Sequence, residues 1–381
     1  MELYTEEHSI FRRSFKKFIE KEFQPYLEEW EKEKKVPDWF FTKLGDQGYL
    51  APWIDEKYGG SGVGFEYEAI ILNELSKLDC GLGTIICVHN DIVPPYINTF
   101  GSEEQKERWL PSCCNGEKVY AVAMTEPNAG SDLKALSATA IKKGDNYVLN
   151  GTKTFITNGM NAGIVVLAAK TDLKADPPHK GISIFVVEDG TPGFIKSRKL
   201  DKVGLNNNET AELVFEDCVI PASNLLGGEG KGFYCMMEAL QQERLVVSMV
   251  AQGSAERMLA DTIEFAKSRK AFGRPIGELQ HINFKLAEMA TEVELGRTFL
   301  EKCLYAHVKG ENIVQEVSMA KYWVCEMANR IAYQGMQIHG GYGYMEEYPI
   351  ARFFRDVRAH PIFAGTTEIM KLIIGRNLIQ G

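Results

Sequence analysis

The sequence has little of what marks a nucleic-acid-binding or membrane protein. Its 43 lysines and arginines stand against 52 aspartates and glutamates, a formal charge of −9. Because phosphate binding needs a concentrated basic surface, this balance argues against nucleic acid as the main partner. No apolar run reaches the roughly 18 residues of a membrane span, and the first residues lack a secretory signal. We therefore expect a cytoplasmic protein without a transmembrane helix.

The sequence also has few signs of disulfide bonds or of a metal site. The eight cysteines form no CxxC pair, and no histidine cluster has the spacing of zinc ligands. We therefore expect reduced core cysteines and no bound metal. Apolar residues make up 45% and charged residues 25% of the 381 residues, which excludes a disordered or collagen-like chain and predicts two or three domains.

The common nucleotide and hydrolase signatures are missing. No GxGxxG follows a strand, and Gly227–Gly232 lacks the spacing and ending of a P-loop. Neither a GxSxG elbow nor an HExxH motif occurs. A classical dinucleotide fold, a P-loop enzyme, an α/β-hydrolase and a zinc protease are therefore poor candidates.

The hydrophobic pattern changes twice along the chain. Apolar positions at helical spacing, with turns between them, predict helices over 5–35, 38–48, 66–79 and 102–114. Short runs rich in β-branched residues predict strands of an antiparallel sheet or barrel at 119–124, 146–150, 164–167 and 182–187. After Gly232 the chain is helical again, with a long amphipathic stretch at 279–308. The predicted fold is a multidomain α+β protein: an N-terminal α-bundle (1–117), an antiparallel β-barrel or sandwich (118–229) and a C-terminal four-helix-type bundle (230–381).

Three polar or glycine-rich segments are candidates for binding. Thr125–Asp132 follows a strand as a polar turn, which suits a plain loop or hydrogen bonds to an electron-rich ring. Gly340–Gly343 ends a helix, so its glycines serve as a cap or admit a pyrophosphate. Gly365–Glu368 precedes an apolar helix and is typical of a helix start whose amides can meet an anion. His339 is more typical of a packed or capping histidine than of a catalyst.

Taken together and in order, the motifs resemble the acyl-CoA dehydrogenase family from end to end. The matching segments are Ala123–Asp132, Asn150–Gly159, Arg269–Gly273, Gln337–Gly343 and Ala364–Ile369. That family has an α-bundle, a β domain and a second α-bundle, which agrees with the pattern above. The resemblance implies FAD bound non-covalently between the β domain and the C-terminal bundle, in an assembly that is usually a homotetramer.

The resemblance also implies site residues. The flavin ring would be met by Met124, Thr125, Gly130 and Ser131, and on its other side by Phe155, Ile156 and Thr157, although many relatives have Trp in place of Phe155. The pyrophosphate and adenosine would be held by a neighbouring subunit's Arg269, Phe272, Gln280, Gln337, Gly340 and Gly341. Thr366 and Glu368 would add cofactor contacts, and Ser131, Arg244 and Gly365 would lie towards the substrate.

One family feature is missing. Many members carry the proton-abstracting glutamate immediately before the Gly-Thr of the last motif, where this chain has Ala364. A minority, resembling the isovaleryl and long-chain branches, places this base before an arginine on a helix of the C-terminal bundle. Glu243, followed by Arg244, matches that site. Although a helical glutamate is usually solvated, the motif and Ala364 favour Glu243 as the catalytic base.

Asp91 is the second departure. It lies in Cys87–Pro95, which resembles the family's acyl-pocket helix, where relatives typically have a small or apolar residue. It is either a cap or turn aspartate beside the prolines or a second pocket carboxylate. A charge in an apolar site is costly unless used or paired, and His89 or a substrate proton would justify it. As a catalytic base, Asp91 would support a 1,4-type elimination on a cyclic enoyl-CoA.

The leading hypothesis is an FAD-dependent acyl-CoA dehydrogenase that passes electrons to an electron-transfer flavoprotein. A branched or alicyclic substrate is expected, with cyclohexane- or cyclohexene-carboxyl-CoA as the specific guess. A catalytically inactive flavin-binding scaffold is the alternative of another class, and an oxygen-using relative is a further one.

Overall fold

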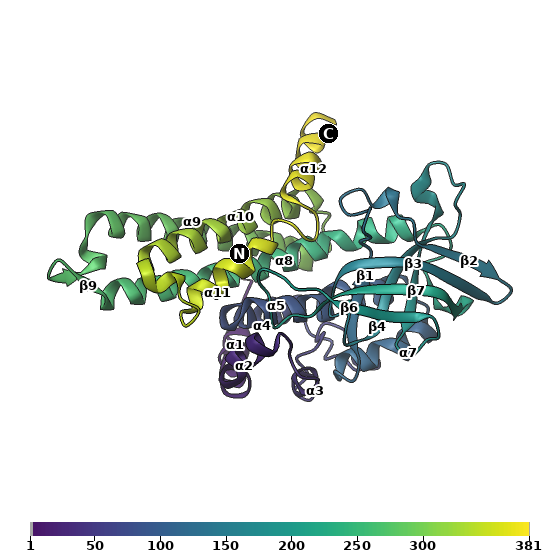
Figure 1. Ribbon diagram of the computed structural model, residues 1–381, viewed down its shortest axis with the longest axis horizontal. Coiled ribbons are helices and arrows are strands. Elements are labelled where there is room, and N and C mark those ends of the chain that lie inside the picture. The colour runs from purple at the N-terminus through teal and green to yellow at the C-terminus, as the bar shows by residue number, and fades with distance from the viewer. Residues whose placement is uncertain (1–2, 381) are drawn as a thin grey trace.

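The computed structural model describes residues 3–380 as two helical parts with a β-sheet between them (Figure 1). The N-terminal helices are α1 (Glu6–Glu22), α2 (Leu27–Glu33), α3 (Trp39–Gly45), α4 (Phe65–Leu78), α5 (Cys80–Ile86), α6 (Pro94–Phe100) and α7 (Glu103–Cys114). The stretch predicted as one helix over 5–35 is two, because Pro25 interrupts it in a short 3₁₀ turn. The helices predicted at 38–48, 66–79 and 102–114 are confirmed as α3, α4 and α7.

Between α5 and α6 the chain forms a π-helical turn, Cys87–Ile92, which carries Asp91. The two prolines that follow it have no N–H to donate back into the turn. The carbonyl oxygen of Asp91, which an ordinary helix would bond to the amide of Pro95, instead accepts a 2.9 Å bond from Gln242 Nε2 of the C-terminal part. A side chain of the C-terminal part therefore holds the π-helical turn in place.

An eight-stranded sheet separates the helical parts, and its strands follow the order β6-β7-β3-β2-β4-β5-β8, with β1 beside β4. The strands are β1 (Val119–Ala123), β2 (Thr139–Lys143), β3 (Asn146–Thr157), β4 (Ala162–Lys170), β5 (Ile182–Glu188), β6 (Phe194–Lys199), β7 (Thr210–Pro221) and β8 (Leu225–Leu226). The four predicted strands are confirmed as β1, β3, β4 and β5. The predicted β domain is confirmed, but the sheet is mixed and not closed into a barrel, since β1 and β2 run parallel to β4.

Strand β4 shows how the sheet is covered. Ile164, Val166 and Ala168 face the core that continues into the helices. Their alternating neighbours, Val165 and Leu167, belong to a second, smaller core on the other face. Because successive side chains of a strand point to opposite faces, β4 is buried on both sides.

The C-terminal part is built of helices, the three longest of which lie side by side (Figure 1). The helices are α8 (Gly232–Ser268), α9 (Gln280–Val308), α10 (Val314–His339), α11 (Pro349–Asp356) and α12 (Thr367–Gln380). Strands β9 (Lys270–Ala271) and β10 (Arg274–Pro275) form a hairpin between α8 and α9, at the end of the bundle away from the sheet. None of the helices within residues 3–380 has the length and apolarity to cross a membrane.

Candidate active site

The carboxyl group of Glu243 lies on α8 where that helix meets α6. Its Oε1 accepts a 2.9 Å hydrogen bond from the Tyr96 hydroxyl, and the residue is only 6% exposed. Burial raises the pKa of Glu243 to about 7, although the bond from Tyr96 and the charge of Arg244 act in the opposite direction. A carboxyl with a pKa near neutrality is suited to accepting a proton from a substrate.

Arg244 supplies a buried donor beside this carboxyl. Its Nε is buried and has no hydrogen-bond acceptor, and burial lowers the pKa of its guanidinium. Buried polar groups in native proteins normally have a partner. An unsatisfied donor next to Glu243 is therefore available to a ligand.

The Ala364–Thr366 segment is held by a lysine of α10. Lys321 of α10, which is buried, donates to the carbonyl oxygen of Gly365. Burial lowers the pKa of Lys321, and the positive charge of Arg244 lowers it further. The two cations are therefore near each other. The structure thus brings Glu243, Arg244 and the segment with Ala364 together.

Asp91 belongs to a buried pair of carboxyl groups. Its Oδ1 accepts a 3.3 Å bond from Trp53 Nε1, while its Oδ2 has no donor. Its charge interacts with that of Glu68 on α4, which is also fully buried. The two acids therefore disfavour each other's ionised form.

The pKa values of this pair have a clear physical cause. Burial raises the pKa of Glu68 to about 8, even though Asn90 Nδ2 donates to both of its oxygens at 3.1 Å. Burial, reinforced by the charge of Glu68, holds the pKa of Asp91 well above its usual range. With a pKa of about 8, Glu68 is mostly protonated at neutral pH.

Two expectations for this region are corrected. Asp91 caps no helix, because it lies inside the π-helical turn and its carboxyl accepts from Trp53. His89 is not its partner either. Its Nε2 lies 3.0 Å from the carbonyl oxygen of Cys113, and burial lowers the pKa of His89 to about 4, so the ring is neutral.

The residues expected at the flavin ring lie on two adjoining segments of the β domain. The amide of Thr154 donates to the carbonyl of Thr125 at 2.9 Å, which holds the turn after β1 against the end of β3. Gly130 and Ser131 are exposed, and Phe155 is 69% exposed with a left-handed φ of 60°. The flavin-side residues brought together are Met124, Thr125, Gly130, Ser131, Phe155, Ile156 and Thr157.

The residues expected at the adenosine end gather around the β9–β10 hairpin. A cavity of about 470 Å³ is lined by residues that include Arg269, Gly340 and Gly341. A Cβ built on either glycine would meet no atom within 4 Å, so the backbone there is open to a ligand. Phe272 is 91% exposed at the hairpin tip, and Gln280 and Gln337 are exposed nearby.

These two groups of residues lie at opposite ends of α8 (Figure 1). That helix has 37 residues, and a rise of about 1.5 Å per residue makes it about 55 Å long. One cofactor cannot contact both ends within a single chain.

The remaining predicted residues have local partners. Thr366 begins α12 by accepting a 3.3 Å bond from the amide of Ile369, and Glu368 is exposed in the first turn. His339 stacks on Phe265 at 4.3 Å and its Nδ1 lies 2.7 Å from the carbonyl of Gly335. His339 is therefore a packed histidine, and Gly340 (φ 60°) ends the helix.

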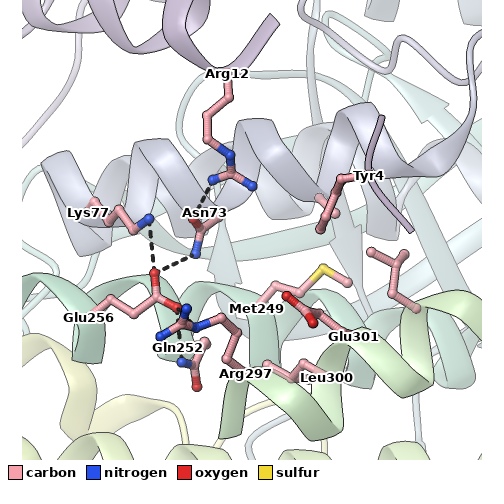
Figure 2. Close-up of a pocket in the computed structure, with 12 residues that line it drawn as sticks. Tyr4, Arg12, Asn73, Lys77, Met249, Gln252, Glu256, Arg297, Leu300 and Glu301 are labelled. Carbon is pink, nitrogen blue, oxygen red and sulfur yellow. Dashed lines mark hydrogen bonds and ion pairs between the residues drawn. The ribbon is translucent and has the colours of Figure 1, made fainter. Parts of the chain in front are cut away.

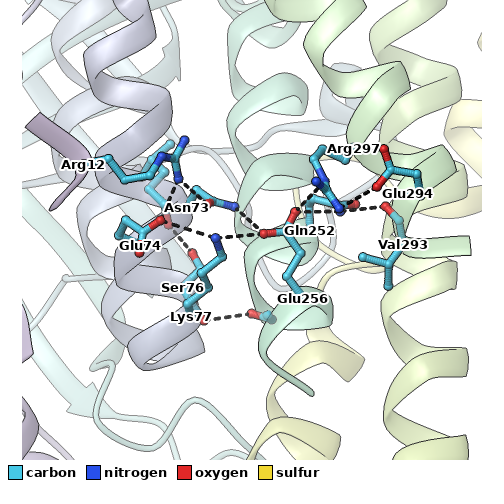
Figure 3. A network of polar contacts seen from close by, with 12 residues as sticks. Arg12, Asn73, Glu74, Ser76, Lys77, Gln252, Glu256, Val293, Glu294 and Arg297 are labelled. Atoms are coloured by element: carbon cyan, nitrogen blue, oxygen red, sulfur yellow. Dashed lines mark hydrogen bonds and ion pairs between the residues drawn. The ribbon is translucent and has the colours of Figure 1, made fainter. Parts of the chain in front are cut away.

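A charged network joins the helices that carry Glu68 and Glu243 (Figure 3). Lys77 of α4 contacts Glu256 of α8 at 2.9 Å, and Arg297 of α9 contacts the same carboxylate at 3.4 Å. These residues also line a cavity of about 240 Å³ under Tyr4 (Figure 2). Because its cations are already paired with acids, we assign this cavity to helix packing and not to the candidate site.

Three partners of the site were missed from the sequence. Tyr96, Trp53 and Glu68 belong to no motif. Glu68 alone carries a signal, since it precedes Ile71, Leu72 and Leu75 at helical spacing and so lies on the apolar face of α4. A glutamate on an apolar face predicts a buried carboxyl.

Comparison with known proteins covers the whole fold. Family models described as acyl-CoA dehydrogenase N-terminal, middle and C-terminal domains match residues 5–117, 121–218 and 230–379. The chain is 45% identical to the long-chain specific acyl-CoA dehydrogenase of Sus scrofa over 99% of this chain and 88% of that protein. It is 37% identical to the isovaleryl-CoA dehydrogenase of Pongo abelii over 98% of this chain and 88% of that protein. The crystal structure of an acyl-CoA dehydrogenase from Geobacillus kaustophilus has 55% identity and a TM-score of 0.97, with 99% of each chain covered.

Proposed function

Because this chain belongs to the acyl-CoA dehydrogenase family, whose members are FAD-dependent oxidoreductases, we propose that Glu243 is its catalytic base. The observation that carries this proposal is a buried carboxyl with a pKa of about 7, next to the buried Arg244 on α8. Ala364, at the position where many family members place the base, cannot accept a proton. Long-chain and isovaleryl enzymes, the branches in which the resemblance expects a relocated base, are among the relatives.

The residues of the chain fit a flavin. An exposed aromatic side chain, Phe155, stands beside a polar turn whose Gly130 has open space in place of a side chain. An FAD bound there supplies the acceptor for a hydride from the carbon β to the thioester. Phe155, Ile156 and Thr157 would cover one side of the ring, and Met124, Thr125, Gly130 and Ser131 the other.

The protein's own part in the reaction is the proton. Glu243, desolvated on α8, would take it from the carbon next to the thioester carbonyl. The unsatisfied Nε of Arg244 suits an oxygen of the bound thioester or its CoA, and Ser131 and Gly365 would line the same substrate. Water is kept from Glu243 by the packing of Tyr96 against it.

A ring substrate is a second candidate, favoured by one observation. Asp91 and Glu68 are two fully buried carboxyl groups, and the backbone of Asp91 is bonded to the helix of Glu243. In its ionised form Asp91 would act as a base at a distal ring carbon. The candidate reaction is a 1,4-type elimination on cyclohexene-carboxyl-CoA, and a plain dehydrogenation of a branched acyl-CoA or cyclohexane-carboxyl-CoA needs Glu243 alone.

The partners follow from the same proposal. We expect a second copy of the chain to supply Arg269, Phe272, Gln280, Gln337, Gly340 and Gly341, with Thr366 and Glu368 adding contacts, in a homotetramer. Electrons would pass to an electron-transfer flavoprotein, in the cytoplasm.

Anaerobic flavin bleaching tests the proposal. The purified protein would be mixed with linear, branched, cyclohexane-carboxyl and cyclohexene-carboxyl CoA thioesters, beside Glu243→Gln, Asp91→Asn and the matched control Glu238→Gln, an exposed glutamate of α8. We expect Glu243→Gln to slow bleaching by roughly 10²–10⁴-fold, as for loss of a general base, and Glu238→Gln to match the parent.

Other outcomes of the bleaching experiment would contradict parts of the proposed function. Unchanged bleaching in Glu243→Gln removes this residue as the base. If Asp91→Asn leaves turnover of every ring substrate unchanged, the 1,4-elimination is wrong. Flavin that no acyl-CoA bleaches favours the scaffold, and rapid reoxidation by air indicates an oxygen-using enzyme.

A further inference from the structure

A lysine and a glutamate are buried together beneath the polar turn of the β domain. Lys153 of β3 and Glu126, just after β1, lie 2.8 Å apart, with side chains 0% and 2% exposed. Among the ion pairs of residues 3–380, no other has both side chains buried. Neither residue has a role in the proposed reaction.

The pair is bonded to the backbone on both sides. Lys153 Nζ also donates to the carbonyl oxygen of Met124 at 3.0 Å. The carboxylate of Glu126 accepts from the amide and the hydroxyl of Ser137 at 2.7 and 2.6 Å, and from the amide of Ala138 at 3.0 Å. Each of the two charges is therefore bonded to the backbone as well as to the other, which offsets part of the cost of burying an ion pair.

These bonds fix the shape of the turn. Glu126 and Ala129 exchange backbone hydrogen bonds of 2.9 and 3.1 Å across it, and Lys153 holds the carbonyl that precedes it. Pro127, Asn128 and Gly130 are left exposed on a backbone whose start is anchored from below. The turn is thus ordered before any ligand arrives.

Stability alone does not require charges here. Buried ion pairs can often be replaced by apolar residues of similar size at little cost in stability. Such a replacement would still lose the bond to the Met124 carbonyl and the bonds from Ser137 and Ala138. The feature that only the charged pair provides is the conformation of the exposed turn.

We propose that Lys153, together with Glu126, is a positioning residue that holds Met124–Ser131 in the shape that receives the flavin ring. This inference rests on the proposed function in one respect, that a flavin lies against this turn. It adds two residues that act through the backbone without touching the cofactor. Preorganisation of a binding segment increases affinity because less ordering is left for the binding step.

The test compares holoenzymes of the parent, Lys153→Met, Lys153→Arg and the double variant Lys153→Met/Glu126→Gln. Lys196→Met is the matched control, since Lys196 forms a 2.9 Å ion pair with Asp189 at the surface of the same sheet. The measurements are the rate of FAD release, followed by flavin fluorescence, the visible absorption bands of the bound flavin and thermal unfolding.

We expect Lys153→Met to release FAD at least tenfold faster with shifted absorption bands, Lys153→Arg to fall between it and the parent, and Lys196→Met to match the parent. If the uncompensated Glu126 prevents Lys153→Met from folding, the double variant provides the test instead. It should unfold near the parental temperature and still release FAD at least tenfold faster.

A double variant with the parental release rate and spectrum would overturn the inference and leave the proposed function intact. A parent protein that binds no FAD would overturn both. The two failures are therefore distinguishable.

Discussion

The hydroxyl of Tyr96 on α6 donates a 2.9 Å hydrogen bond to Glu243 on α8, which joins the N-terminal helices to the proposed catalytic base. The bond favours the ionised carboxylate, whereas burial favours the neutral acid. The balance leaves Glu243 with a pKa near physiological pH. Both the burial and the bond therefore set the pH range in which this carboxyl can accept a proton.

The rate of flavin bleaching should rise with pH through the pKa of Glu243. Because only the ionised carboxylate can accept a proton, and its pKa is about 7, the rate should increase about tenfold per pH unit below that value and level off above pH ~8. Stopped-flow bleaching between pH 5.5 and 9 measures this. A rate that is flat over the range would contradict the role of Glu243.

Tyr96→Phe should move this profile to higher pH. Loss of the hydrogen bond removes a contact that favours the carboxylate, so the pKa of Glu243 should rise by about one unit. Bleaching at pH 7 should slow by roughly five- to tenfold and return to the parental rate at pH 9. Tyr147→Phe is the control, because that hydroxyl bonds Glu229 at 2.6 Å in the β domain. An unshifted profile in Tyr96→Phe would show that the bond does not tune the base.

Glu68→Gln should flatten the dependence of stability on pH. The folded pKa of Glu68, about 8, lies above the ordinary glutamate value of 4.5, so the folded state binds more protons and stability falls as pH rises between these values. In Glu68→Gln, the melting temperature should therefore fall less between pH 5 and pH 9 than it does in the parent. The difference should correspond to a few kcal/mol in the free energy of unfolding. Glu66→Gln, on the same helix but outside the pair, should keep the parental slope. Equal slopes for Glu68→Gln and the parent would argue against the raised pKa of Glu68.

Gly341→Val should weaken FAD binding without destabilising the chain. A side chain there meets no protein atom within 4 Å but projects towards the cavity beside Arg269. The melting temperature of protein stripped of FAD should stay within about 2 °C of the parent, because the site is open and surface changes are usually within about 0.5 kcal/mol. FAD titration should show at least tenfold weaker binding. Gly375→Val, another open position, is the control, and equal FAD affinity in both variants would place the adenosine elsewhere.

Local pattern predicted most of the elements but not their pairing. The β-branched run at 164–167 predicts β4, because strand propensity is a property of neighbouring residues. The parallel neighbour of β4, which is β1, lies about 45 residues away by the register of Val119 with Ala162. No local signal encodes such a contact, so the sequence predicts an antiparallel sheet where the structure has a mixed one.

The candidate site, too, could be predicted only in part from the sequence. Glu243 was predicted from its place before Arg244 and from the loss of the acid at Ala364. The state of Asp91 was not predictable, because it depends on Glu68 and Trp53, which reach it from other parts of the N-terminal domain. Burial also cannot be read from one residue, and it is burial that raises the pKa of Glu243.

The length of α8 has a genetic consequence. The first third of the helix carries the proposed base and its C-terminal end leads to Arg269, so each chain would contribute to two different sites. A chain with Glu243→Gln still offers an intact Arg269 to the site of its neighbour. A chain with Arg269→Ala still has an intact catalytic base in its own site. Two inactive alleles expressed together would therefore complement one another, because mixed assemblies contain some sites built entirely from intact parts.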